Sequence, residues 1–127
     1  NTLETVVYLN TRKGSFTKIP LPVEAQFSPV YAISINDFDG DNQLDILLGG
    51  NLYQSKPEVG RYDASYGLYL KGNGKGNFKT VSSKDSGFKL KGQARGFSMV
   101  TVNNKPVLMV ANNNEQAQAF TIQKGKN

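Results

Sequence analysis

The residues best suited to chemistry are the acidic segment 37–45, which reads Asp-Phe-Asp-Gly-Asp-Asn-Gln-Leu-Asp. Its carboxylates stand at every second position except one. Calcium is a hard cation that takes roughly six to eight oxygen ligands, and a tight loop of alternating acids can provide them. Two unit charges ~4 Å apart repel by about 4 kcal/mol at an effective dielectric constant near 20, so a cation would relieve strain in such a loop. The segment therefore predicts a Ca²⁺ site rather than a solvated acidic turn. The expected ligands are the side chains of Asp37, Asp39, Asp41 and Asp45 and the backbone carbonyl of Gln43.

The residues around this segment indicate that it joins two β-strands. Residues 30–35 and 44–50 are short apolar runs bounded by Gly, Asn and Asp, which is typical of buried strands. An EF-hand would need a helix on each side and a glutamate at the twelfth loop position, where this chain has Leu48. The sequence thus predicts a calcium loop between strands and excludes an EF-hand.

Composition narrows the function classes. The chain has 127 residues, 38% of them hydrophobic, with 13 Gly and 5 Pro, which fits one loop-rich β domain. No apolar run approaches the ~18 residues of a membrane-spanning helix. The absence of Cys and His excludes disulfides, zinc sites built on these residues and His-based nucleophilic catalysis. Because the only dense carboxylate cluster is assigned to a metal, we expect no enzymatic activity.

Charge is unevenly distributed along the chain. Residues 1–63 hold 5 basic and 8 acidic side chains, whereas residues 64–127 hold 10 basic and 2 acidic ones. The lysines of the second half are scattered through Gly- and Ser-rich turns without interleaved stacking aromatics. This pattern favours a solvated face over an acidic glycan or membrane surface, and it disfavours nucleic acid as a partner.

The chain also contains an internal repeat. Residues 8–16 return as 69–78, at an offset of 61 at the tyrosine and 62 at the phenylalanine. Residues 44–51 return as 106–113 at an offset of 62, and residues 32–35 match 96–99 at an offset of 64. The second connecting loop must therefore be about two residues shorter, and its acids are gone, so we expect no calcium there.

Nine strands are predicted in all, at 4–10, 15–20, 30–36, 44–50, 66–71, 77–82, 95–102, 106–112 and 117–123. A four-strand unit that repeats at this period predicts the blades of a β-propeller. Residues 1–29 would be the last two strands of one blade, 30–82 a complete calcium-binding blade, and 83–127 an incomplete terminal blade. The alternative is a small sandwich or an open sheet. Either way the fold is all-β and antiparallel, with no helix longer than two turns.

Successive side chains of a strand point to opposite faces of the sheet, so the alternation of apolar residues indicates which of them form the core. The expected core residues are Ile33, Ile35, Ile46, Leu48, Met99, Leu108 and Val110.

The pattern Asp-x-Asp-x-Asp-x-x-x-Asp between apolar strands, followed by a Gly-x-Phe turn, resembles the FG-GAP/VCBS repeat of integrin α-subunit propellers and many bacterial surface proteins. Residues 60–70, 92–95 and 112–115 are similar to the C-terminal end of large bacterial extracytoplasmic members. The resemblance implies the same metal positions as above. It departs at Asn42, where the family usually has Gly; Asn tolerates a left-handed backbone better than other non-Gly residues. A seven-bladed ring at this period would need more than about 400 residues, so the chain represents two to three blades.

Function is weighed between classes, because a fold alone does not fix it. The leading hypothesis is a non-catalytic, calcium-stabilised binding or scaffolding module of a bacterial surface or secreted protein, with a protein or glycan partner. The alternative is an ancillary propeller of a secreted carbohydrate-active enzyme, and a third reading is a lectin-like protein. Arg61, Tyr62 and Asp63 lie in the long connection 51–66, which could contact a ligand. Unpaired strand edges at both ends would favour self-association.

Overall fold

The structure, a computed structural model, describes residues 3–50 and 66–123 and consists almost entirely of antiparallel β-structure. Its longest described helix, α1 (Ser83–Ser86), has four residues, and a short 3₁₀ turn, η1, spans Val23–Gln26. Within the described ranges no helix has the length and apolar character needed to cross a membrane. The strands are β1 (Val6–Asn10), β2 (Phe16–Pro20), β3 (Ala32–Asn36), β4 (Asp45–Gly49), β5 (Leu68–Gly72), β6 (Phe78–Val81), β7 (Ala94–Val102), β8 (Lys105–Asn112) and β9 (Gln118–Thr121).

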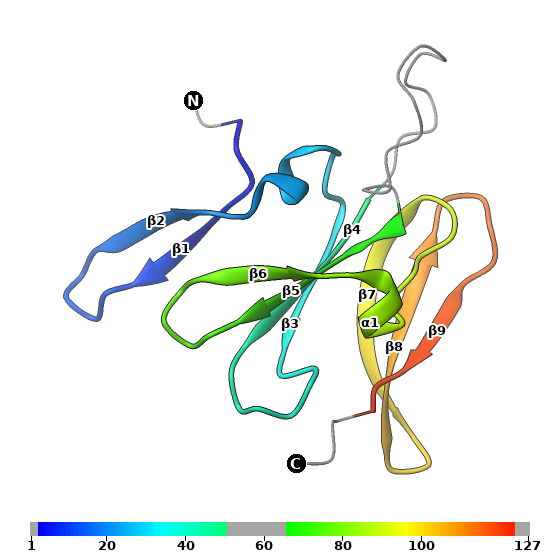
Figure 1. The fold of residues 1–127 in the computed structure, drawn as a ribbon. Helices are drawn as coiled ribbons and strands as arrows, with labels where there is room; N and C mark the ends of the chain where they lie inside the picture. The colour runs from blue at the N-terminus through cyan, green and yellow to red at the C-terminus, as the bar shows by residue number, and fades with distance from the viewer. Residues whose placement is uncertain (1–2, 51–65, 124–127) are drawn as a thin grey trace.

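Three small sheets stand next to one another (Figure 1). The first contains β1 and β2, the second β3 to β6 and the third β7 to β9, and each strand pairs with its neighbour in sequence. All nine predicted strands are present, and their division into groups of two, four and three is as predicted. The predicted all-β, antiparallel class is confirmed.

The strand pairing fixes the register of the internal repeat. Phe16 pairs with Asn10 in the first sheet as Phe78 pairs with Gly72 in the second, so the offset is 62 in both strands. The two tyrosines that match in sequence, Tyr8 and Tyr69, are therefore one position out of register. A slip of one residue moves a side chain to the opposite face of a sheet. Tyr8 is accordingly 58% exposed, whereas Tyr69 is 9% exposed.

Two apolar clusters hold the sheets together. The first joins one face of the second sheet to the third sheet, through Leu47 and Tyr69 on one side and Leu108 and Val110 on the other. The second cluster joins the opposite face of the second sheet, including Ile46, Leu48 and Leu70, to Leu21 and Ala25 near the first sheet. Each interface thus uses equivalent strand faces, as expected for a repeat. Of the predicted core, Ile46, Leu48, Leu108 and Val110 are buried, and Met99 is partly buried against the first cluster.

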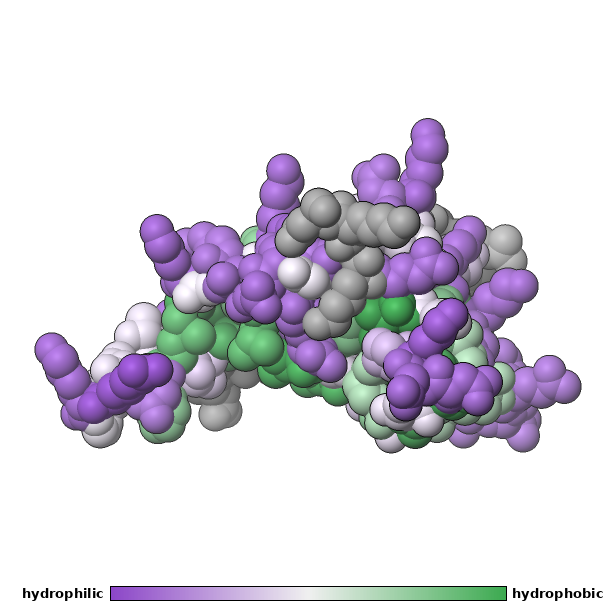
Figure 2. All heavy atoms as spheres, turned by 90° about the horizontal axis from the view of Figure 1, so that it is seen from below, coloured by the Kyte–Doolittle hydropathy of each residue, from purple (hydrophilic) through white to green (hydrophobic). Residues whose placement is uncertain are grey.

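The prediction that Ile33 and Ile35 belong to the core is wrong. They lie opposite Leu48 and Ile46, on the same face of the second sheet, but are 57% and 58% exposed. The reason is the size of the neighbouring sheet. Its two strands, β1 and β2, cover only part of that face, and β3 lies outside the covered part. Figure 2 shows apolar surface left open along the underside of the molecule, between polar rims.

Candidate metal centre

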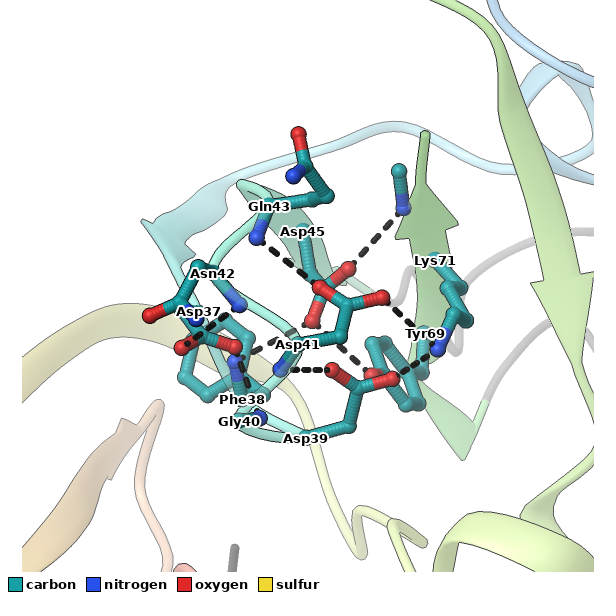
Figure 3. A network of polar contacts seen from close by, with 11 residues as sticks. Asp37, Phe38, Asp39, Gly40, Asp41, Asn42, Gln43, Asp45, Tyr69 and Lys71 are labelled. Atoms are coloured by element: carbon teal, nitrogen blue, oxygen red, sulfur yellow. Dashed lines mark hydrogen bonds and ion pairs between the residues drawn. The ribbon is translucent and has the colours of Figure 1, made fainter. Parts of the chain in front are cut away.

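The acidic loop connects β3 to β4, beyond the last strand pair, Asn36 with Asp45. Its backbone turns through two residues in the left-handed region, Gly40 at φ 87° and Asn42 at φ 65°. Asn42 therefore adopts the conformation for which Gly is usually selected, and a short polar side chain tolerates it at modest cost. The turn curls the loop, and its carboxylates form hydrogen bonds to backbone amides of the loop and to residues of β5 (Figure 3).

Backbone amides hold the loop carboxylates in place. Asp37 Oδ1 accepts a hydrogen bond from the Gly40 amide at 2.7 Å, and Asp39 Oδ1 accepts one from the Asp41 amide at 3.1 Å. Asp41 Oδ1 accepts one from the Gln43 amide at 2.8 Å. Such local side-chain-to-backbone bonds are characteristic of Asp in turns. Each carboxylate keeps lone pairs that these bonds do not use.

Asp45, the first residue of β4, anchors the loop to the second sheet. It is fully buried, and its carboxylate accepts three hydrogen bonds: from the Phe38 amide at 3.1 Å, the Tyr69 hydroxyl at 2.9 Å and the Gly72 amide at 2.9 Å. A buried charge is tolerated only when it is hydrogen-bonded or paired. The donors come from the loop and from β5, so Asp45 ties the acidic loop to the neighbouring strand.

Three of the predicted ligands converge. One carboxylate oxygen from each of Asp37, Asp39 and Asp45 lies within 4.8 Å of the others. Asp41 does not belong to this group; its carboxylate lies beside Asp39 and pairs with Lys71 at 2.9 Å. Gln43 contributes its backbone amide to Asp41, as described above. The predicted ligand-contact residues Arg61, Tyr62 and Asp63 lie outside the described residues.

Two residues of β5, Tyr69 and Lys71, also belong to the site, although the sequence analysis did not identify them as site residues. The Lys71 ammonium group contacts the carboxylates of both Asp39 and Asp41 (Figure 3). These hydrogen bonds raise the pKa of Lys71 above its ordinary value, and the bond to Lys71 lowers the pKa of Asp41. Burial, followed by the hydrogen bond to Asp45, raises the pKa of Tyr69, so this phenol stays protonated and donates.

The donor set fits a hard divalent cation. All four acids of the loop offer oxygen, the ligand type that Ca²⁺ and Mg²⁺ prefer, and Cys and His are absent from the chain. Lys71 already compensates part of the negative charge from the side of the loop. An ion bound between Asp37, Asp39 and Asp45 would compensate the remainder and would compete with Lys71 for Asp39.

Comparisons with known proteins give no relatives for this chain. No family model, no curated protein and no solved structure matches it. A functional conclusion therefore rests on the geometry of the loop and on the repeat that surrounds it.

Proposed function

We propose that the loop between β3 and β4 binds one Ca²⁺ ion and that the ion has a structural role. The observation that supports this most directly is the convergence of Asp37, Asp39 and Asp45. The fully buried Asp45 ties any bound ion to β5, because its carboxylate also accepts from Tyr69 and Gly72. The ion would thus brace the loop against the second sheet, with Asp41 and the Gln43 carbonyl as the further ligands expected from the sequence pattern.

The sheets themselves are proposed to be blades of a β-propeller of the FG-GAP/VCBS type, one complete and two partial. In support, equivalent strand faces form both interfaces between sheets. The two outward faces also keep large apolar side chains exposed: Tyr8 and Phe16 on the first sheet, and Val100 and Val102 on the third. Such faces are expected at the ends of a repeat array that has no capping units.

On this basis the chain serves as a non-catalytic binding or scaffolding module of a bacterial surface or secreted protein. Calcium sites of extracellular modules have dissociation constants of roughly 10⁻⁴–10⁻³ M, which suits a compartment rich in calcium. Propellers present loops on a rigid frame, so the partner, a protein or a glycan, would contact the loops that join the strands.

The test is a comparison of thermal unfolding in calcium and in chelator for Asp39→Ala. Asp39 is 28% exposed and contributes no buried hydrogen bond to the sheets, so the variant is expected to fold. Ligand at 100 times its dissociation constant stabilises the native state by about 2.7 kcal/mol. We expect calcium to raise the melting temperature of the unmodified chain and to leave that of Asp39→Ala unchanged.

The matched control is Asp85→Ala, which removes the same charge from the cap of α1, where Asp85 contacts Ser82. This variant should lose the same stability in both buffers and keep the full response to calcium. Equal melting temperatures of the unmodified chain with calcium and with chelator would overturn the proposed site.

A further inference from the structure

The acidic loop contributes an apolar side chain to the interface between the second and third sheets. Phe38 lies between Asp37 and Asp39 in the chain, yet only 8% of it is exposed. Its ring belongs to the apolar cluster that joins these two sheets, together with Leu108 and Val110 of β8. One residue of the loop is therefore part of the candidate metal centre through its neighbours and part of the core through its side chain.

Two contacts tie Phe38 to the candidate metal centre. The Phe38 amide donates to Asp45 Oδ2 at 3.1 Å, and the Tyr69 hydroxyl donates to the same oxygen at 2.9 Å. The rings of Phe38 and Tyr69 meet edge to face, with their centroids 6.3 Å apart (Figure 3). Because Asp37 and Asp39 are joined to Phe38 by peptide bonds, a movement of their carboxylates also moves the Phe38 ring within the interface.

The opposite side of the second sheet has no such connection. The apolar cluster that joins it to the first sheet consists of buried Leu21, Ala25, Ile46, Leu48 and Leu70. No residue of the acidic loop 37–45 belongs to this cluster. The second sheet thus has one interface that includes a side chain of the acidic loop and one that does not, and the second serves as an internal control for the first.

We propose that ion binding to the acidic loop strengthens the interface between the second and third sheets through Phe38, so that calcium regulates the docking of the third sheet. This inference rests on the calcium site proposed above. A bound ion holds Asp37 and Asp39 in one arrangement, and with them the ring between them. Without the ion, the like charges of the carboxylates repel, which favours arrangements that spread the loop and withdraw the ring.

The third sheet is sensitive to this change because it is small. It has three strands, which is close to the lower limit for a sheet that is stable without packing against another element. A weaker interface therefore allows the third sheet to open as a local unit while the rest of the molecule stays folded. The first sheet lies at the other interface, so its opening should depend little on the ion.

Native-state hydrogen exchange of the full chain, in chelator and in calcium, tests the proposal. Calcium is set at about 100 times the dissociation constant measured by isothermal titration, so openings that release the ion become about 100-fold rarer. We expect exchange of the amides of Leu108, Met109 and Val110 in β8 to slow by at least about tenfold, and that of β1 and β2 by less than about threefold. A series at low denaturant concentrations separates these local openings from global unfolding.

Two variants make the test specific. Phe38→Ala and Phe88→Ala remove the same side chain, 8% exposed in both cases, from the same apolar cluster. Phe88 packs edge to face with Phe97 and Phe120 of the third sheet and lies outside the acidic loop. Both variants should be less stable than the unmodified chain, but only Phe38→Ala should reduce the effect of calcium on β8, to less than about threefold. The milder pair Phe38→Leu and Phe88→Leu should give the same order if an alanine variant does not fold.

The outcomes separate this inference from the calcium site on which it rests. Calcium binding with equal slowing of exchange in β8 and in the first sheet would overturn the inference and leave the site intact. A full effect of calcium on β8 in Phe38→Ala would do the same, because the ion would then act without the Phe38 ring. Absence of calcium binding in the titration of the unmodified chain would overturn the proposed site, and this inference with it.

Discussion

The two inner hairpins of the molecule, β3–β4 and β7–β8, begin as equivalents and end differently. Beyond the pair Asn36 and Asp45, the first hairpin opens into the acidic loop. The second continues through two more strand pairs, of which Val102 with Lys105 is the last, and closes with Asn103 and Asn104. Both of these asparagines have positive φ, 49° and 59°, as a two-residue hairpin turn requires. The same frame thus supports either a tight turn or a loop able to bind an ion.

The difference extends beyond the loop itself. Asp45, which anchors the loop, corresponds to Val107 in the second hairpin, as the repeat at an offset of 62 requires. On the neighbouring strands, Tyr69 and Lys71 of β5 correspond to Ala119 and Thr121 of β9, since Leu70 corresponds to Phe120. The anchor Asp45, its partner Tyr69 and the lysine that contacts Asp39 and Asp41 are therefore replaced together. The acidic loop thus depends on side chains of β5, and it is more than an insertion into a hairpin that the two sheets share.

The largest expected effect on stability comes from replacing Asp45 of the first hairpin by valine, the residue at the equivalent position of the second hairpin. Asp45→Val leaves the donors on Phe38, Tyr69 and Gly72 buried without an acceptor, and each such group costs about 1–3 kcal/mol. We expect the free energy of unfolding in chelator to fall by roughly 3–5 kcal/mol. Asp45→Asn keeps one acceptor oxygen and should lose less, which provides a measurable variant if the first does not fold. A loss below about 1 kcal/mol for Asp45→Val in denaturant titration would contradict the anchoring role.

Next in size is a comparison of equivalent core positions in the two hairpins. Met99 is partly buried against the second sheet, whereas Ile35 is 58% exposed. Truncation of a buried Met costs about 2–5 kcal/mol. We expect Met99→Ala to lower the free energy of unfolding by about 2 kcal/mol and Ile35→Ala by less than about 1 kcal/mol. Equal losses in denaturant unfolding of the monomer would mean that Ile35 is covered in solution.

This pair also shows what the sequence could predict about the fold. Apolar runs bounded by turn residues located all nine strands, and the repeat assigned them to the correct sheets. Alternation identified the face to which Ile33 and Ile35 belong, but burial depends on what stands opposite that face. The first sheet has only β1 and β2, and this information is not local to β3. The match of Tyr8 with Tyr69 failed for a related reason, because residue identity does not reveal strand register.

At the site, the sequence supplied the acids but not their partners. Asp37, Asp39 and Asp45 were expected together because they are close in the chain. Tyr69 lies 24 residues from Asp45 and Lys71 lies 32 residues from Asp39, and only the pairing of β4 with β5 brings them near. A usable signal was present in the change from Tyr-x-Lys in β5 to Ala-x-Thr in β9. Reading it requires the structural register of the repeat.

A smaller effect is expected when Lys71 is replaced by the residue of the second hairpin. Lys71→Thr removes an ammonium group that contacts Asp39 and Asp41 and would compete with a bound ion. Because exposed ion pairs are weak, the calcium affinity should rise only about two- to fivefold in isothermal titration. Lys105→Thr, at the end of the other hairpin, removes the same charge far from the acids and should leave the affinity nearly unchanged. A weaker affinity for Lys71→Thr would show that the lysine organises the loop instead of competing for it.

The smallest effect concerns the backbone of the two turns. Asn42 in the acidic loop and Asn104 in the tight turn both have positive φ, 65° and 59°, which glycine adopts without a steric penalty. In the folded state, glycine relieves strain at both positions, while in the unfolded state its greater freedom opposes this gain. We expect Asn104→Gly to stabilise the chain by about 0.5 kcal/mol, because Asn-Gly suits this turn. Asn42→Gly should change the stability by less, since the Asn42 amide donates to Asp37 at 3.3 Å in either case. Chemical denaturation in chelator distinguishes the two, and a loss above about 1 kcal/mol for Asn42→Gly would mean that its side chain, and not only its backbone, shapes the acidic loop.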